Sequence, residues 1–121
     1  MRLILLIEDD KDIRDSVSEV LEVEGFKVVS AANGQEGLEY LRSPGSARPD
    51  VILLDLMMPV LNGMQFRTLQ LSDSKFANIP VIVMSADNRA LLKAEEMKST
   101  RCILKPLDIA DLLSVIESVL A

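Results

Sequence analysis

The sequence predicts an α/β fold, a doubly wound sandwich with a five-stranded parallel sheet between two layers of helices. Short apolar runs alternate with stretches of helical periodicity five times along the chain, as expected of serial strand–helix units. Runs such as 3–7 lack the polar alternation of a half-exposed strand, so they predict strands buried on both faces. With 121 residues, 49% of them hydrophobic, we expect positions 1–121 to form a single domain with no output domain on this chain.

The boundaries of the elements follow from the apolar pattern and from residues that start or stop regular structure. Apolar runs predict strands at 2–7, 26–30, 51–54, 81–84 and 101–104, with Pro80 tolerated before the fourth strand. Helical periodicity predicts helices at 12–24, 35–42, 64–71 and 90–98, and a last helix from an N-cap at Asp108 to about Leu120. Gly25 suits a helix C-terminus, and Asn62-Gly63 is typical of a turn.

Composition excludes several classes of protein. A net charge of −6 argues against direct nucleic-acid binding, which needs a basic surface. Apolar runs of about five residues are far shorter than the ~20 that span a bilayer, so no membrane insertion is expected. No signal peptide is visible and the lone Cys102 cannot form an internal disulfide, which together favour a cytoplasmic location. The absence of histidine excludes Ser-His-Asp chemistry and histidine-ligated metals.

Polar side chains stand where the predicted strands end. Asp55 closes the apolar run 51–54, and a charge at that place is costly unless something pairs with it. The other strand-end groups are Glu8, Asp9, Ser85 and Lys105. In open parallel sheets, ligands bind beyond the carboxyl ends of the strands. We therefore predict that these five side chains form one site.

The residue types at this predicted site favour phosphoryl chemistry. Glu8, Asp9 and Asp55 would raise one another's pKa unless a cation lay among them. Oxygen ligands of this kind suit Mg²⁺, or alternatively Mn²⁺, and Mg²⁺ commonly also binds a phosphate. Lys105 can hold a phosphoryl oxygen, Ser85 can donate to one, and Asp55 can act as a nucleophile that forms an aspartyl phosphate.

With these motifs in order, the chain resembles the receiver domain of bacterial two-component response regulators. The motifs are Glu8-Asp9, Asp55 in Asp-Leu-Met-Met-Pro, the Met58-Pro59…Asn62-Gly63 loop, Ser85-Ala86 and Lys105-Pro106. The resemblance implies a flavodoxin-like sheet of strand order 2-1-3-4-5. It also implies that Asp55 accepts the phosphoryl group, and that Asp9, Asp55 and the carbonyl of Met57 hold Mg²⁺ while Glu8 reaches it through water.

The resemblance implies partners and roles as well. The phosphoryl donor would be a histidine kinase, a histidine phosphotransfer protein or a small phosphodonor, and a downstream protein would read the switched surface. Lys105 would pair with the phosphoryl group and Ser85 would follow it on activation. The chain would catalyse only its own phosphorylation and dephosphorylation, as a monomer or a phosphorylation-dependent dimer, with a cis Lys105-Pro106 peptide.

The sequence departs from the family pattern in ways that bear on output. Cys102 stands where the family usually has Tyr or Phe, so the usual rotation of an aromatic ring cannot occur. The interval from Ser85 to Lys105 is about two residues shorter than is typical of the family, which predicts a trimmed fourth helix or loop. Met57 and Asp87 occupy positions that flank the attacking water in the family, and we expect them to tune the lifetime of the phosphorylated state.

Three other functions remain open from the sequence. An aspartate-nucleophile phosphatase of the haloacid-dehalogenase type needs a second Asp where Met57 stands. A flavodoxin-like cofactor binder needs a phosphate loop in place of the acidic 8–10 segment. A receiver-like scaffold that is never phosphorylated is disfavoured by the complete set of strand-end residues.

Overall fold

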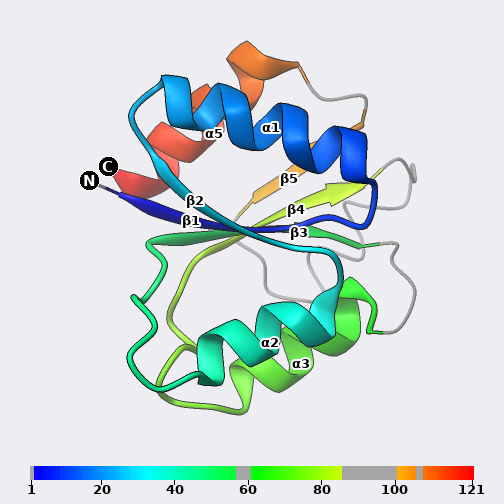
Figure 1. Cartoon of the computed structure of the whole chain (residues 1–121), viewed down its shortest axis with the longest axis vertical. Coiled ribbons are helices and arrows are strands. Elements are labelled where there is room, and N and C mark those ends of the chain that lie inside the picture. The colour runs from blue at the N-terminus through cyan, green and yellow to red at the C-terminus, as the bar shows by residue number, and fades with distance from the viewer. Residues whose placement is uncertain (1, 57–60, 86–100, 106–107) are drawn as a thin grey trace.

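The computed structural model describes residues 2–56, 61–85, 101–105 and 108–121. Five parallel strands form one sheet in the order β2-β1-β3-β4-β5, with α1 and α5 on one face and α2 and α3 on the other (Figure 1). The predicted fold class and strand order are confirmed. The predicted fourth helix, 90–98, lies outside the described residues.

The elements fall close to their predicted places. They are β1 (Leu3–Ile7), α1 (Lys11–Val23), β2 (Lys27–Ala31), α2 (Gly34–Arg42), β3 (Val51–Asp55), α3 (Gly63–Leu71), β4 (Val81–Ser85), β5 (Arg101–Leu104) and α5 (Ile109–Leu120). The second strand starts one residue later than predicted, because the amide of Phe26 donates to the carbonyl of Leu21 at 3.0 Å and so belongs to the end of α1. Gly25 supplies the positive φ of +97° that this chain reversal requires.

The core consists of two layers, one on each face of the sheet. Every residue of β1, β3 and β4 is buried, as expected when helices cover both faces of a parallel sheet. Alternate residues of β1 divide between the layers: Leu5 and Ile7 pack in the layer of α2 and α3, whereas Ile4 and Leu6 pack in the layer of α1 and α5. Since both faces are filled with apolar side chains, a polar site can form only at an edge or an end of the sheet.

Helix starts are fixed by side-chain caps. The caps of α1, α2, α3 and α5 are Asp10, Asn33, Asn62 and Asp108, each accepting from an amide of its first turn. The Asn62 cap adds a reciprocal bond from its amide to the Gln65 side chain at 3.0 Å. Among the described residues, no helix is long and apolar enough to cross a bilayer.

Candidate functional site

Four strand ends meet at the carboxyl edge of the sheet. Asp55 and Ser85 are the last residues of β3 and β4, while Glu8 and Lys105 directly follow β1 and β5. Two backbone bonds extend the sheet to the site, one from the Glu8 amide to the Ala31 carbonyl at 3.0 Å and one from the Lys105 amide to the Ser85 carbonyl at 2.8 Å. The strands therefore hold these side chains in place through backbone pairing.

The Lys105 ammonium bridges two buried carboxylates. Its Nζ lies 2.7 Å from Oε1 of Glu8 and 3.2 Å from Oδ2 of Asp55. Glu8 is 0% exposed and Asp55 3% exposed. The second oxygen of Glu8 accepts from the amide of Asp10 at 3.3 Å. Both oxygens of Glu8 are thus occupied by donors within the protein.

Burial and pairing act in opposite directions on these groups. Burial raises the pKa of Glu8, but hydrogen bonds with Asp55 and Lys105 and the charge of Lys105 outweigh it, so the pKa lies below its usual value. Burial lowers the pKa of Lys105, but the Glu8 hydrogen bond and the charges of Asp55 and Glu8 hold it above its usual value. Both groups are therefore charged at neutral pH.

Three carboxylates lie close enough to share one metal ion. Glu8, Asp9 and Asp55 each offer an oxygen within 4.8 Å of the other two. Asp9 is exposed, and no residue in the described part of the chain hydrogen-bonds its carboxylate. An all-oxygen set beside open solvent fits a hard divalent cation that keeps several waters.

The loop that carries the acids is anchored by a residue that sequence reasoning missed. Arg14 Nη1 donates to the carbonyl of Glu8 at 2.8 Å and to that of Asp9 at 3.4 Å. An arginine one turn into an amphipathic helix has no distinctive sequence signal, because only the fold shows that it reaches back to the loop.

The backbone behind Asp55 is also tightly packed. A Cβ placed on Gly63 would lie 2.8 Å from the Asp55 carbonyl oxygen and 2.8 Å from the Leu56 Cα. The Gly63 amide donates to the Leu56 carbonyl at 3.1 Å. The turn predicted at Asn62-Gly63 thus brings α3 directly against the end of β3.

Comparison with known proteins identifies the family. Residues 4–117 match the response regulator receiver domain. The chain belongs to this family. The receiver resemblance drawn from the sequence is therefore confirmed, and with it the place of the chain in two-component signalling.

Individual relatives agree with this assignment. The chain is 34% identical over 122 residues to the transcriptional regulatory protein CpxR homolog of Haemophilus influenzae, with 99% of this chain and 51% of the relative covered. It is 32% identical to protein PilH of Pseudomonas aeruginosa, with 100% and 99% covered. The structure matches chemotaxis response regulator CheY4 of Vibrio cholerae with a TM-score of 0.89, 29% identity and 98% of both chains covered.

The relatives differ in length. The chain spans 34% of the alkaline phosphatase synthesis regulator SphR of Synechococcus elongatus and 51% of the CpxR homolog, but nearly all of PilH. The receiver unit is therefore what the chain shares with all of them.

Several predicted residues of the receiver site lie outside the described residues. These are Met57, Asp87 and Pro106, so the metal-ligating carbonyl, the lifetime positions and the cis peptide stay predictions. Cys102 is described: it pairs with Val83 across β4 and β5 and is half-buried against the layer of α2 and α3. Burial raises the pKa of its thiol, so at neutral pH it is a packing residue.

Proposed function

We propose that this receiver domain accepts a phosphoryl group on Asp55 and thereby switches a surface read by a downstream protein. The observation that carries the proposal is the setting of Asp55, buried at the end of β3 with Lys105 Nζ 3.2 Å from one oxygen. Burying a cation-paired carboxylate beside two more acids costs desolvation free energy, and packing of the fold does not require such an arrangement.

Magnesium fits the residues present. Asp9 and Asp55 would bind the ion directly, with the carbonyl of Met57 as the third protein ligand. Glu8 would act through water, because its two oxygens already accept from Lys105 and from the Asp10 amide. When bound, the ion would neutralise charge on the transferring phosphoryl oxygens. Mn²⁺ would satisfy the same oxygen set.

The protein's own residues position and neutralise the phosphoryl group. With a phosphohistidine donor, an Asp55 oxygen would form a bond to phosphorus as the nitrogen–phosphorus bond breaks, and the electron pair would leave on the histidine nitrogen, which takes up a proton. With acetyl phosphate, the oxygen–phosphorus bond would break and acetate would leave. Lys105 already pairs with Asp55 and could pair with an oxygen of the phosphoryl group. Ser85, at the end of the neighbouring strand, could donate a hydrogen bond to another phosphoryl oxygen. The chain would catalyse only this transfer and the hydrolysis of the aspartyl phosphate, in which water takes the phosphoryl group as inorganic phosphate and Asp55 returns to its free carboxylate.

The partners follow from the family. A histidine kinase, a histidine phosphotransfer protein or a small phosphodonor would supply phosphate in the cytoplasm. The chain would act as a single receiver domain, monomeric or dimeric on phosphorylation. Because Cys102 offers no aromatic ring, we propose an output step other than ring rotation.

Phosphorylation of the purified chain tests the proposal. With Mg²⁺ and acetyl phosphate, intact-mass spectrometry should show one added phosphate, and peptide mapping should place it on Asp55. Asp55→Asn should abolish the addition, whereas Asp10→Asn, at an exposed acid that only caps α1, should leave it in place. Phosphate on another residue, or an equal effect of the two variants, would contradict the assignment.

A second experiment separates the switch from an unphosphorylated scaffold. Beryllofluoride mimics an aspartyl phosphate, so titration with Mg²⁺ and beryllofluoride should shift the amide resonances of residues near Asp55. The scaffold alternative predicts no shift at any of these resonances.

A further inference from the structure

A basic hollow lies at the end of the sheet opposite Asp55. It consists of two adjoining clefts of about 150 and 380 Å³ that share Leu41, Lys75 and Phe76. The walls are the end of α2, the 43–49 segment before β3 and the 73–79 segment before β4. Both segments precede strands of a parallel sheet, so they lie at the end of the sheet opposite the acidic site (Figure 1).

The charge of the distal hollow is opposite to that of the whole chain. Its lining contains three cations, Arg42, Arg48 and Lys75, and one acid, Asp73, whereas the chain carries a net charge of −6. The Asp73 carboxylate accepts from the backbone amide of Lys75 at 2.9 Å. Within the described residues, no carboxylate forms an ion pair with any of the three cations.

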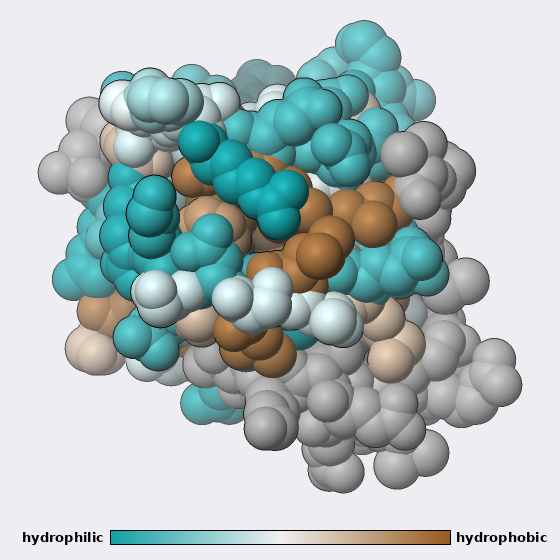
Figure 2. Space-filling model, turned by 90° about the horizontal axis from the view of Figure 1, so that it is seen from below, coloured by the Kyte–Doolittle hydropathy of each residue, from teal (hydrophilic) through white to brown (hydrophobic). Residues whose placement is uncertain are grey.

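The floor of the distal hollow is apolar. Phe76 and Ile79 are buried beneath it, and Leu41 is half-buried beside them. Figure 2 looks onto the α2 and α3 side of the molecule, where apolar surface lies between hydrophilic side chains. An occupant that matched this surface would place an apolar side chain on the floor and carboxylates against the rim.

The walls are held in place before anything binds. The buried Gln70 side chain donates to the carbonyls of Phe76 at 2.9 Å and Ile79 at 3.1 Å, which fixes the segment before β4. Tyr40 donates its hydroxyl to the Ala47 carbonyl at 2.8 Å, which fixes the segment before β3. A preformed surface loses little entropy on binding, so even a small contact can give measurable affinity.

We propose that the distal hollow docks an acidic peptide segment of a partner protein, with an apolar residue of that segment on the floor. The three cations come from three separate segments and line two adjoining clefts, which suits an extended chain with several carboxylates better than one small anion. The distal hollow lies at the end of the sheet opposite Asp55, so a partner could bind there without covering Glu8, Asp9 and Asp55.

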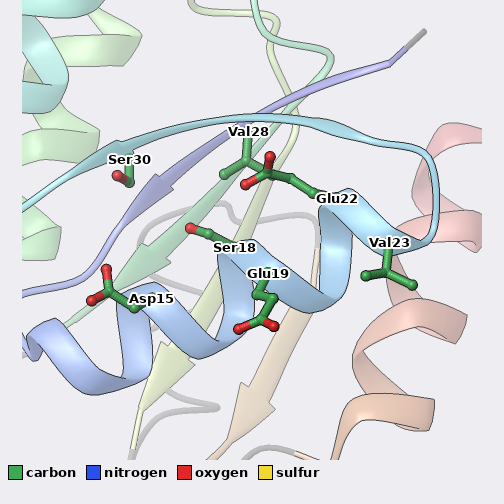
Figure 3. A pocket seen from close by; sticks show the side chains of 7 residues that line it. All are labelled: Asp15, Ser18, Glu19, Glu22, Val23, Val28 and Ser30. Carbon is green, nitrogen blue, oxygen red and sulfur yellow. The ribbon is translucent and has the colours of Figure 1, made fainter.

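A groove elsewhere on the molecule provides an internal contrast. Between α1 and β2 lies a groove of about 540 Å³, and its described lining residues include Asp15, Glu19 and Glu22 but no cation (Figure 3). An acidic peptide should avoid this groove, so the two surfaces make opposite predictions for the same probe.

Nuclear magnetic resonance of the ¹⁵N-labelled chain tests the proposal. The probe is a short acetylated and amidated peptide in which Asp and Glu flank a Leu-Phe pair, titrated to millimolar concentration. Backbone amides within 41–49, apart from the two prolines Pro44 and Pro49, and within 73–79 should shift, and those of 15–30 should not. Raising the salt from about 0.05 to 0.5 M should weaken binding severalfold, because the rim charges are exposed.

Two matched variants separate site binding from bulk charge. Replacing Arg42, Arg48 and Lys75 by Gln should weaken binding about tenfold, the sum expected from three exposed charge pairs. Replacing Lys11, Lys27 and Arg101 by Gln changes the net charge equally, and should change binding less than about twofold. All six side chains are exposed, so both variants should fold.

Four results would overturn the proposal. They are no shift at millimolar peptide, equal weakening by both variants, equal shifts with a peptide whose acids are replaced by Lys, and saturation of the same amides by inorganic phosphate at the same affinity. The last result would indicate a small-anion site in place of a peptide dock.

Discussion

Replacing Lys105 by Met removes the cation that bridges the two buried carboxylates of the site in the described part of the chain. The methionine keeps most of the aliphatic volume, so the change is chiefly electrostatic. Glu8 and Asp55 would be left with oxygens within 4.8 Å of each other and no ammonium at 2.7 and 3.2 Å. We expect a large loss of stability in the absence of Mg²⁺.

The magnitude follows from the separation of the two carboxylates. Their oxygens lie within 4.8 Å of each other, and at that upper limit two like charges in an effective dielectric constant of about 20 repel by roughly 3.5 kcal/mol. The protein can avoid this by protonating one carboxyl, which at pH 7 costs about 3–4 kcal/mol for a group of ordinary pKa. Both routes give a loss of about 3–4 kcal/mol, which agrees with the usual cost of breaking a buried ion pair.

The loss should depend on pH with a definite sign. Without Lys105, burial and repulsion raise the carboxyl pKa in the folded state above its unfolded value. The folded state then binds more protons, so the variant gains stability relative to wild type as pH falls. At pH 5 the protonation cost is only about 1 kcal/mol, and most of the difference should disappear. Saturating Mg²⁺ should also restore stability at pH 7, because it replaces the missing positive charge.

Urea denaturation at pH 5, 6 and 7, with EDTA or with Mg²⁺, measures these differences. Lys11→Met is the matched control, because Lys11 Nζ also lies 2.7 Å from a carboxylate, that of Asp15, but on the exposed face of α1. Exposed pairs contribute little, so the control should change stability only slightly at every pH.

Two outcomes would refute this reasoning. A loss in Lys105→Met that stayed constant from pH 5 to 7 would mean that lost packing, and not charge, causes it. A loss no larger than that of the control would mean that solvent screens Glu8 and Asp55 far more than their burial implies.

Three further predictions concern the same end of the sheet. The pKa of Glu8 is lowered in the folded state, so the stability that Glu8 contributes is present above its unfolded pKa of about 4.3 and is lost as pH falls through its folded pKa. Urea denaturation of Glu8→Gln should therefore show a smaller loss of stability in acid than wild type. Gly63→Ala should cost about 1–3 kcal/mol by overpacking and slow phosphorylation, because its Cβ meets the Asp55 carbonyl. Gly45→Ala meets nothing within 4 Å, but the φ of +81° strains a side chain there, so this control should lose some stability and leave the phosphorylation rate unchanged. Mg²⁺ at tenfold excess over its dissociation constant should raise the free energy of unfolding by about 1.4 kcal/mol, and Asp9→Asn should remove most of that gain.

Much of the site could be predicted from the sequence because strand ends are marked by local pattern. Asp55 and Ser85 each close an apolar run, and the carboxyl ends of parallel strands must share an edge. The pairing of Lys105 with Glu8, 97 residues apart, could not be read in this way. It depends on side-chain reach across two intervening strands.

The backbone contacts that anchor the site could likewise not be read from the sequence. Arg14 holds the acidic loop through backbone carbonyls, and Gly63 permits close approach to the Asp55 carbonyl. Carbonyl oxygens are present at every residue, so the sequence carries no signal of which ones are contacted. The distal hollow is a similar case, because its cations come from segments separated by up to 33 residues, Arg42 to Lys75.

The sequence by itself determined the strand–helix alternation, the burial of the sheet on both faces and the residues at the carboxyl edge, because periodicity and strand ends are local properties. Only the tertiary structure decided which charges pair, which oxygen of Glu8 meets which donor, and where cations gather far from the acids. Those features depend on distances of a few ångströms between segments remote in the chain, and electrostatic energies change steeply over such distances.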